Sequence, residues 1–207
     1  MKGILLGKKE GNTAESQKPF ILWLIGCALA ESLTILAGNK EKTGTVMERK
    51  QENFKEMLAF GEEGEHEVAD FLIKKGVTVL PLYQFEKEHA PYLISKNGNI
   101  TSPDLICFKE DAFMVEVKTK RQWVEYNGRV ETGFNMKHYR HYKEIKTMTG
   151  KPVYVFFNHK EQEPTGIFFT ELDKHTRIWD GKFNGVKKYE PLIFYDINVL
   201  KRVCNSK

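Results

Sequence analysis

The sequence SPDLICFKEDAFMVEVKTK, residues 102–120, decides the fold and carries the candidate chemistry. It contains two short apolar runs, Leu105–Phe108 and Ala112–Val117, which are separated by the polar turn Lys109–Asp111. Two apolar runs of strand length joined by a short polar turn predict a β-hairpin. The other elements are predicted outward from this hairpin.

Three charged residues of this stretch lie on strands that are otherwise suited to burial. Asp104 opens the first strand directly after Pro103, and Glu116 and Lys118 lie two residues apart in the second. Because side chains alternate along a strand, Glu116 and Lys118 share one face. Burying a charge costs free energy unless the charge is paired, binds a cation or takes part in chemistry. This cost marks the stretch as a candidate site.

The residue types fit the hydrolysis of a phosphodiester. Two carboxylates can hold a hard cation such as Mg²⁺, which keeps several waters. A neighbouring lysine can orient or deprotonate an attacking water and stabilise charge on a phosphate. Asp104, Glu116 and Lys118 therefore indicate a phosphodiester-cleaving group. The structural alternative is a turn at Pro103-Asp104 and an exposed Glu116/Lys118 pair.

Pro103-Asp104, followed after eleven residues by Glu116-Val117-Lys118, resembles the signature of the PD-(D/E)XK nuclease superfamily. The resemblance implies an α/β fold with a restriction-endonuclease-like core, a central mixed β-sheet flanked by helices. It also implies Mg²⁺-dependent cleavage of DNA, with Mn²⁺ as an alternative metal. Asp104 and Glu116 would hold the metal with the Val117 carbonyl, and Lys118 would position the attacking water.

The chain before the hairpin predicts two helices and a strand. Apolar spacing predicts a helix over Glu48–Phe60, which Gly61 interrupts. A second helix is predicted over Glu62–Lys75, with Gly76 as its C-cap. The β-branched run Val77–Leu82 then predicts the first strand.

Glu65 is the acid nearest the apolar stripe of the second helix, which consists of Val68, Phe71 and Leu72. Gly64 lies almost on that stripe and allows a close approach to the element that the helix covers. Glu65 either belongs to a solvated first turn, where acids suit the helix dipole, or leans over the sheet as a third carboxylate. The sequence GEEGE at 61–65 resembles the first-helix motif of PD-(D/E)XK enzymes, including Holliday-junction resolvases. This resemblance implies that Glu65 helps to bind the metal.

A polar loop near Lys87–Asn99 leads from the first strand to the hairpin. Within it, Tyr92–Ile94 predicts a short edge strand, and Asn97-Gly98 is a turn signal. The length of the loop predicts a surface excursion that could touch substrate.

The chain after Lys118 is rich in cations that alternate with aromatic residues, and it holds few acids. This composition favours a groove that binds phosphates and stacks bases. A solvated helix face above a buried aromatic stripe would give the same pattern. The cations include Lys143 and Lys146, and we expect nucleic acid to contact Lys120, Arg121, Lys137, His138 and Arg140.

One helix is predicted within this basic region. Asn135 is its N-cap, and Gly150 with Pro152 ends it. Its inner stripe is predicted to be Met136, Tyr139, Tyr142, Ile145 and Met148. His138 and His141 have the spacing of zinc ligands, but no Cys or third His is placed to complete a site.

The remaining chain predicts strands. Pro152–Phe157 and Gly166–Thr170 are apolar runs typical of buried strands. The segments after them, up to Val203, predict peripheral strands, with Glu190 and Asp196 as surface acids. No nucleotide-binding glycine motif and no serine-hydrolase motif occurs, so those classes have no support.

Composition sets the broad class. The 207 residues, 41% hydrophobic and 29% charged, suit one globular domain with an appendage. The net charge of +4 and a pI of about 8.8 are compatible with a nucleic-acid partner. The cysteines, Cys27, Cys107 and Cys204, lack the spacing of a disulfide framework or a zinc finger. A reducing, cytoplasmic location is therefore expected.

Residues 1–46 differ from the rest and are treated as an N-terminal extension to a nuclease-like domain over 47–207. Phe20–Gly38 is a largely apolar run of membrane-spanning length, but it has Glu31 in its middle. It reads as a membrane anchor, as a signal peptide with small residues at Ala28 and Ala30, or as the product of an upstream start before Met47. The sequence leaves these three alternatives open.

The sequence predicts a metal-dependent nuclease acting on DNA. A non-catalytic nucleic-acid-binding module on the same fold is the alternative, with the carboxylates serving the structure. Many enzymes of similar type act as dimers, so a homodimer is expected by analogy alone.

Overall fold

The computed structural model describes residues 43–82, 91–96 and 98–203. The apolar run Phe20–Gly38, and with it the three alternatives for the N-terminal extension, lies outside these residues. Within the described ranges, no helix combines the length and the apolar character needed to cross a lipid bilayer.

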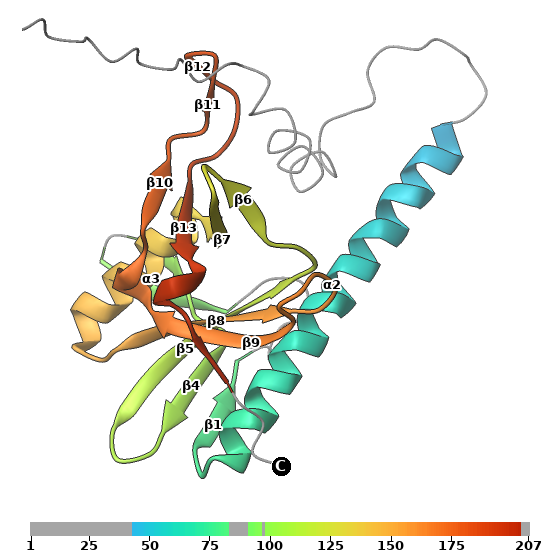
Figure 1. The fold of residues 1–207 in the computed structure, drawn as a ribbon. Helices are drawn as coiled ribbons and strands as arrows, with labels where there is room; N and C mark the ends of the chain where they lie inside the picture. The colour runs from blue at the N-terminus through green and yellow to red at the C-terminus, as the bar shows by residue number, and fades with distance from the viewer. Residues whose placement is uncertain (1–42, 83–90, 97, 204–207) are drawn as a thin grey trace, which may run out of the picture. The chain divides into compact units, whose positions relative to one another are not determined.

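A single helix, α2, spans Thr43–Lys74 in place of the two predicted helices (Figure 1). The predicted interruption at Gly61 is wrong, because one glycine lowers helix stability by only about 1 kcal/mol. The Gly61 carbonyl accepts a hydrogen bond from Thr119 Oγ1 at 3.3 Å, which ties this turn to a strand. The predicted stop at Gly76 is confirmed, since its φ is +77° and its amide donates to the Ile73 carbonyl at 2.9 Å.

The main sheet has six strands in the order β1-β4-β5-β8-β9-β14. They are β1 Thr78–Pro81, β4 Leu105–Phe108, β5 Ala112–Lys120, β8 Val153–His159, β9 Gly166–Glu171 and β14 Lys201–Arg202. β5 and β8 are parallel and the other neighbouring pairs are antiparallel, so the sheet is mixed. The predicted hairpin is confirmed as β4 and β5, in which Leu105 pairs with Val115.

The second helix, α3, spans Met136–Thr149 with the predicted caps. The Asn135 side chain accepts from the Lys137 amide at 2.6 Å, and Gly150 adopts a left-handed conformation with a φ of +65°. Most of the predicted inner stripe is buried or partly buried, but Met148 is 52% exposed, so its assignment to the stripe is wrong. The core beneath α3 ends at Ile145, one turn earlier.

A second sheet has the order β10-β13-β7-β6. Its strands are β6 Val124–Tyr126, β7 Arg129–Asn135, β10 Arg177–Trp179 and β13 Leu192–Asp196. The sequence did not predict β6 and β7, because Glu131, Thr132 and Gly133 interrupt the apolar pattern. All three are nevertheless buried where β7 pairs with β13.

The prediction of peripheral C-terminal strands is wrong for β13. Ile193 and Tyr195 of this strand are fully buried in the core. Glu190 is exposed as predicted, but Asp196 is buried. Its carboxylate accepts from the Asn198 amide at 2.9 Å and caps the 3₁₀ helix η4, Ile197–Val199. Asp196 therefore has a structural role as a cap.

Two short hairpins complete the described fold. The predicted edge strand is β2, Tyr92–Ser95, which pairs with β3, Gly98–Thr101, in a separate two-stranded sheet. The other hairpin joins β11, Lys182–Phe183, to β12, Val186–Lys187.

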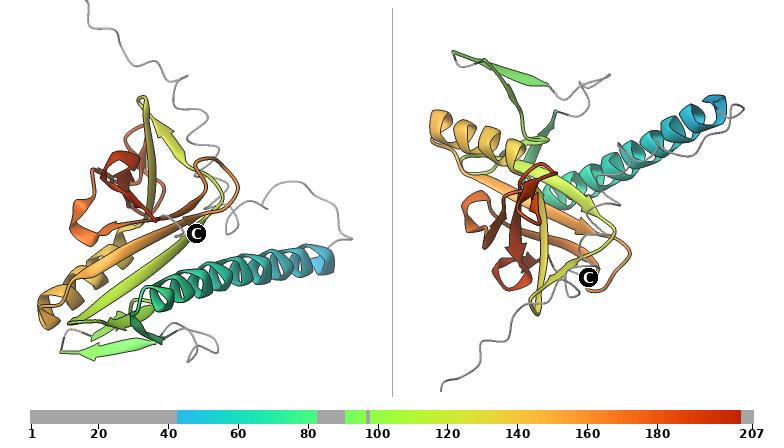
Figure 2. Two further views of the ribbon diagram at one scale, coloured as in Figure 1. Left: turned by 60° about the horizontal axis from the view of Figure 1, so that its bottom comes forward. Right: turned by 90° about the horizontal axis from the view of Figure 1, so that it is seen from above.

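The six-stranded sheet has a hydrophobic core on each face. One core joins Val68 and Leu72 of α2 to Val115 and Val117 of β5. The other contains Met114 of β5 with buried residues of α3, β7, β8 and β13. Two views show α2 along one face of the sheet, and α3 with the second sheet on the other (Figures 1 and 2). By alternation along β5, Glu116 and Lys118 point to the α3 side.

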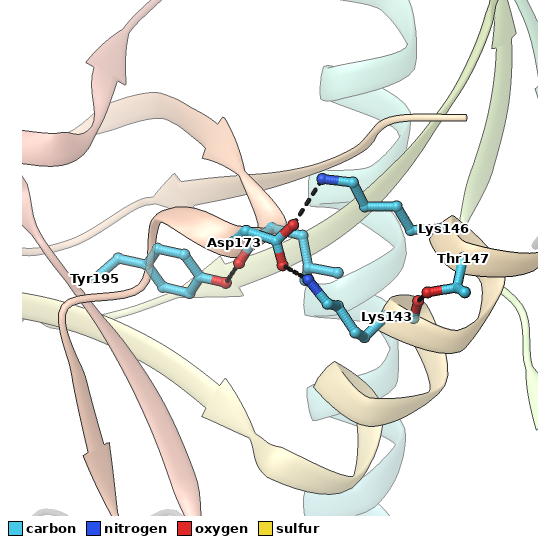
Figure 3. A network of polar contacts seen from close by, with 6 residues as sticks. Lys143, Lys146, Thr147, Asp173 and Tyr195 are labelled. Atoms are coloured by element: carbon cyan, nitrogen blue, oxygen red, sulfur yellow. Dashed lines mark hydrogen bonds and ion pairs between the residues drawn. The ribbon is translucent and has the colours of Figure 1, made fainter. Parts of the chain in front are cut away.

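Ion pairs hold α3 to the short 3₁₀ helix η3, Leu172–Lys174. Asp173 accepts from Lys143 at 2.6 Å and from Lys146 at 2.7 Å (Figure 3). Tyr195 of β13 donates to the Leu172 carbonyl at 2.7 Å. Two cations of the basic region thus serve the fold.

Candidate functional site

Asp104 is held against the middle of β5. Extending the β4–β5 register by one residue beyond Leu105 and Val115 places Asp104 opposite Glu116. Asp104 Oδ2 accepts the Val117 amide at 2.7 Å, and the Asp104 carbonyl accepts the Leu82 amide at 2.8 Å. The hairpin therefore brings together the two carboxylates, which are separated by eleven residues in the sequence.

Glu116 and Lys118 form an ion pair on the α3 face of β5. The Glu116 side chain is 1% exposed, whereas that of Lys118 is 27% exposed. Burial raises the pKa of Glu116, and the Lys118 ammonium opposes this rise. Within the described part of the chain, neither Glu116 carboxylate oxygen accepts a hydrogen bond of regular geometry. Glu116 is thus a buried acid whose acceptor capacity is incompletely used.

The carboxylates around Lys118 determine its protonation. Burial by itself would lower the Lys118 pKa, but the carboxylates of Glu116, Asp104 and Glu65 outweigh it, and the pKa is raised. The Lys118 side chain is thus an ammonium ion at neutral pH. Lys118 is therefore suited to donate hydrogen bonds and to stabilise negative charge rather than to act as a base.

Tyr142 of α3 belongs to the same cluster, although the sequence predicted it only as a core residue. Its hydroxyl lies beside the Glu116 carboxylate and 3.2 Å from His138 Nδ1. Burial, reinforced by Glu116 and Asp104, raises the pKa of Tyr142 well above its ordinary value. The hydroxyl stays protonated and can donate to a carboxylate. In the sequence, the four-residue spacing of His138 and Tyr142 was the signal that could have linked them, because residues four apart are neighbours on a helix surface.

Glu65 lies on α2 where this helix presses against the end of β5. A Cβ atom on Gly64 would lie 1.9 Å from Thr119 Oγ1, so the predicted close approach at Gly64 is confirmed. Glu65 is half-buried and raises the pKa of both Glu116 and Lys118, which places its charge in the neighbourhood of the pair. The structure thus brings Glu65, Asp104, Glu116 and Lys118 to one region beside the middle and the C-terminal half of β5.

The five residues predicted to contact nucleic acid lie at the end of β5 and on α3. Lys120 ends β5, and Arg121 follows it, paired with Glu161 and placed 4.4 Å from the Phe60 ring centre. The other three, Lys137, His138 and Arg140, lie in the first half of α3.

The three α3 residues differ in exposure and charge. Lys137 and Arg140 are exposed. Burial, with Lys118 and other cations, lowers the pKa of His138 to about 4. His138 is therefore neutral at pH 7 and brings no charge to a phosphate.

The donor atoms at the site suit a hard divalent cation, because carboxylate and carbonyl oxygens are the ligands that Mg²⁺ prefers. Glu116 supplies buried oxygens with unused acceptor capacity. In residues 43–82, 91–96 and 98–203, no group of three or more His, Cys, Asp or Glu side chains is already arranged around an ion position. The types of donor atom at the site thus fit a metal ion. In the structure, however, Glu116 pairs with the Lys118 ammonium group.

Comparison with known proteins gives a weak similarity of fold. No family model and no curated protein matches the chain. Among solved structures, the chain is similar to Hjc, a Holliday junction resolvase from the archaeal hyperthermophile Archaeoglobus fulgidus, with 14% identity and a TM-score of 0.43. The match covers 67% of this chain and 90% of that chain. A similarity of this size assigns no role to any residue.

Proposed function

We propose that this protein is a metal-dependent nuclease that hydrolyses phosphodiester bonds of DNA. The observation that carries the proposal is the buried Glu116, which lies beside Lys118 and opposite Asp104 on paired strands. A buried carboxylate with unused acceptor capacity destabilises a fold, so its presence points to a function. The chemistry that fits this combination of two carboxylates and an ammonium group is phosphoryl transfer to water.

In this proposal Asp104 and Glu116 hold Mg²⁺ or Mn²⁺, assisted by Glu65 and by the Val117 carbonyl. A bound divalent cation supplies charge stabilisation at the phosphate and lowers the pKa of a coordinated water. The chain's own contribution is to fix these oxygens. Asp104 is held by the Val117 amide, and Glu116 is held within the core beneath α3.

Lys118 acts as an ammonium group that orients the attacking water and donates to a non-bridging phosphate oxygen. In the reaction, the water oxygen bonds to phosphorus and gives up a proton to solvent, while the bond to the leaving oxygen breaks and this oxygen takes up a proton from solvent. The products are a phosphate monoester and a hydroxyl group. Negative charge grows on the phosphate oxygens during this step. A fixed ammonium group, 27% exposed, can reach that charge without leaving the sheet.

Tyr142 and His138 orient Glu116 from α3. The Tyr142 hydroxyl lies beside the Glu116 carboxylate and 3.2 Å from His138 Nδ1, so it can donate to Glu116 while it accepts from a neutral His138. The exposed cations Lys137 and Arg140 bind DNA phosphates from the same helix, and Lys120 and Arg121 do so from the end of β5.

A non-catalytic nucleic-acid-binding protein is the second candidate. The ion pair between Lys118 and Glu116 favours it, because the pair compensates both charges without a metal. In this alternative the same cations bind DNA, and the carboxylates only stabilise the fold.

Cleavage assays on the full chain separate the two functions. Plasmid and branched DNA are incubated with Mg²⁺, Mn²⁺ or EDTA, beside the variants Asp104→Asn and Lys118→Ala. Asp111→Asn is the matched control, because Asp111 is an exposed acid in the turn between β4 and β5. We expect metal-dependent cleavage that both site variants lose and the control keeps, with DNA binding retained. Binding without metal-dependent cleavage in the unmodified chain would support the second function.

A further inference from the structure

The β2–β3 hairpin projects from the body of the fold next to the candidate site. It pairs with neither of the larger sheets, and the views in Figure 2 show it extending on the side of α3. An isolated two-stranded hairpin is marginally stable by itself. Its position must therefore be maintained by contacts at its base.

The base of the hairpin is anchored to the candidate site and to α3. Ile100 is buried in the core that contains Tyr142. His141 Nδ1 of α3 lies 3.2 Å from the Thr101 amide and 3.1 Å from Thr101 Oγ1. Ser102 donates to the Pro91 carbonyl through its amide at 3.1 Å and its hydroxyl at 2.8 Å, which closes the base two residues before Asp104. The hairpin is therefore held directly beside the candidate catalytic residues.

Strand β2 of the hairpin exposes large apolar side chains. Tyr92 is 52% exposed and Ile94 is 89% exposed. The two residues alternate with Leu93, so they share one face of the strand, opposite Thr101 and Asn99. On the other face, Ile100 is buried in the core, whereas its partner Leu93 is 39% exposed. An exposed aromatic and aliphatic pair on an anchored projection marks an interaction surface.

The charges next to this surface identify the class of partner. The turns of α3 beside His141 carry two exposed cations, Lys137 and Arg140, and one half-buried acid, Glu144. Lys96 lies exposed at the end of β2. A surface that combines cations with an exposed ring and an aliphatic side chain matches nucleic acid whose bases are unstacked. A protein partner that covers Tyr92 and Ile94 would not require these cations.

We infer that the β2–β3 hairpin is a nucleic-acid-binding wing, in which Tyr92 and Ile94 contact unpaired bases while Lys137 and Arg140 contact phosphates. The inference rests on the proposed function for its substrate class and adds a preference for DNA with unpaired or branched segments. Because the base of the wing is close to Asp104, bases held by the wing would lie next to the phosphate to be cleaved.

Binding by the full chain tests the wing independently of cleavage. The unmodified protein and the double variant Tyr92→Ala/Ile94→Ser are titrated in EDTA against fluorescent duplex DNA and against the same duplex with an unpaired segment that carries 2-aminopurine. Ile178→Ser is the matched control, because Ile178 is a similarly exposed apolar residue on β10. We expect the double variant to bind the unpaired DNA about 5- to 100-fold more weakly, since base stacking on aromatic residues has this magnitude. Its affinity for plain duplex should change less than about twofold, and quenching of 2-aminopurine should be lost.

A second variant tests the wing by a gain of binding. Ile94→Trp should tighten binding to the unpaired DNA and strengthen the quenching, because indole stacks better on bases. Equal losses on both DNAs, or no loss, would overturn the wing. A change from dimer to monomer by sedimentation in the double variant would overturn it in favour of an interface between two copies. If the unmodified protein binds unpaired DNA selectively but cleaves no DNA, the wing is supported and the nuclease is refuted. If the protein cleaves DNA and the double variant binds as the unmodified protein does, the nuclease is supported and the wing is refuted.

Discussion

At the scale of single residues, the site depends on a buried acid that the fold does not fully satisfy. Glu116 has an ion pair with Lys118 and a neighbouring Tyr142 hydroxyl, yet its oxygens lack regular hydrogen bonds among the described residues. A metal would use this remaining acceptor capacity. The same reasoning makes Tyr142 a positioning residue, because it acts on Glu116 and touches no substrate in the proposal.

Tyr142→Phe should lower the cleavage rate by about 10- to 100-fold, because a hydrogen bond to a charged group contributes about 1.5–3 kcal/mol. The loss should be in kcat rather than in DNA affinity, since the hydroxyl orients Glu116. Single-turnover cleavage and metal-free DNA binding measure the two effects separately. Tyr139→Phe is the control, because Tyr139 lies on the same helix and packs against the ring of His175. Equal rates for the two variants would remove Tyr142 from the site.

At the scale of secondary-structure elements, α2 contacts β5 at Thr119, through the carbonyl of Gly61 and through the close approach of Gly64. The Gly61 carbonyl accepts a hydrogen bond from Thr119 Oγ1. At Gly64, a Cβ atom would collide with the same Thr119 oxygen. Gly61, in contrast, has open space where its Cβ would lie. The close contact at Gly64 sets how near the following residue, Glu65, comes to β5.

Gly64→Ala should destabilise the fold by about 1–3 kcal/mol, because the new methyl group overpacks a rigid contact. Gly61→Ala should stabilise it by about 0.5–1 kcal/mol, because alanine is the better helix former and meets no atom. Urea unfolding of the two variants measures both changes. Adding Thr119→Ala to Gly64→Ala should recover part of the loss. Equal stability of the two single variants would show that α2 does not approach β5 as closely as the structure indicates.

At the scale of the whole molecule, two cores on opposite faces of the six-stranded sheet bury ionisable side chains as well as apolar ones. His159, at the end of β8, is buried and stacks on Trp123, with ring centres 3.6 Å apart. Burial, with a contribution from Lys120, lowers the pKa of His159 from 6.5 to about 3. His138 behaves similarly, with a pKa of about 4.

These histidines predict a loss of stability in acid. Below pH 6.5 the unfolded chain binds protons on both histidines, whereas the folded chain leaves them neutral, so stability falls as the pH falls toward 4. Each histidine contributes a slope of up to about 1.4 kcal/mol per pH unit. Urea unfolding at pH 7 and pH 5 should show this fall. His159→Gln should reduce the slope, and His138→Gln provides a second test if the first variant folds poorly. Unchanged slopes in both variants would contradict the assignment.

Local patterns predicted much of the architecture. The β4–β5 hairpin, the caps of α3 at Asn135 and Gly150 and the stop at Gly76 each depend on residues adjacent in sequence, and all are confirmed. The predicted break at Gly61 failed because tertiary contacts hold the helix through a residue of low helix propensity. Strand β7 was missed because its polar residues are buried against β13, a partner about sixty residues away.

The sequence by itself determined the hairpin, the alternation that places Glu116 and Lys118 on one face, and the residue types that suit a hard cation, because these depend on spacing of a few residues. Only the tertiary structure decided that Glu65 reaches this region, that Tyr142 borders Glu116 and that a projecting hairpin is anchored beside Asp104. Those juxtapositions depend on how helices and sheets pack, and packing joins residues whose separation in the chain carries no local signal.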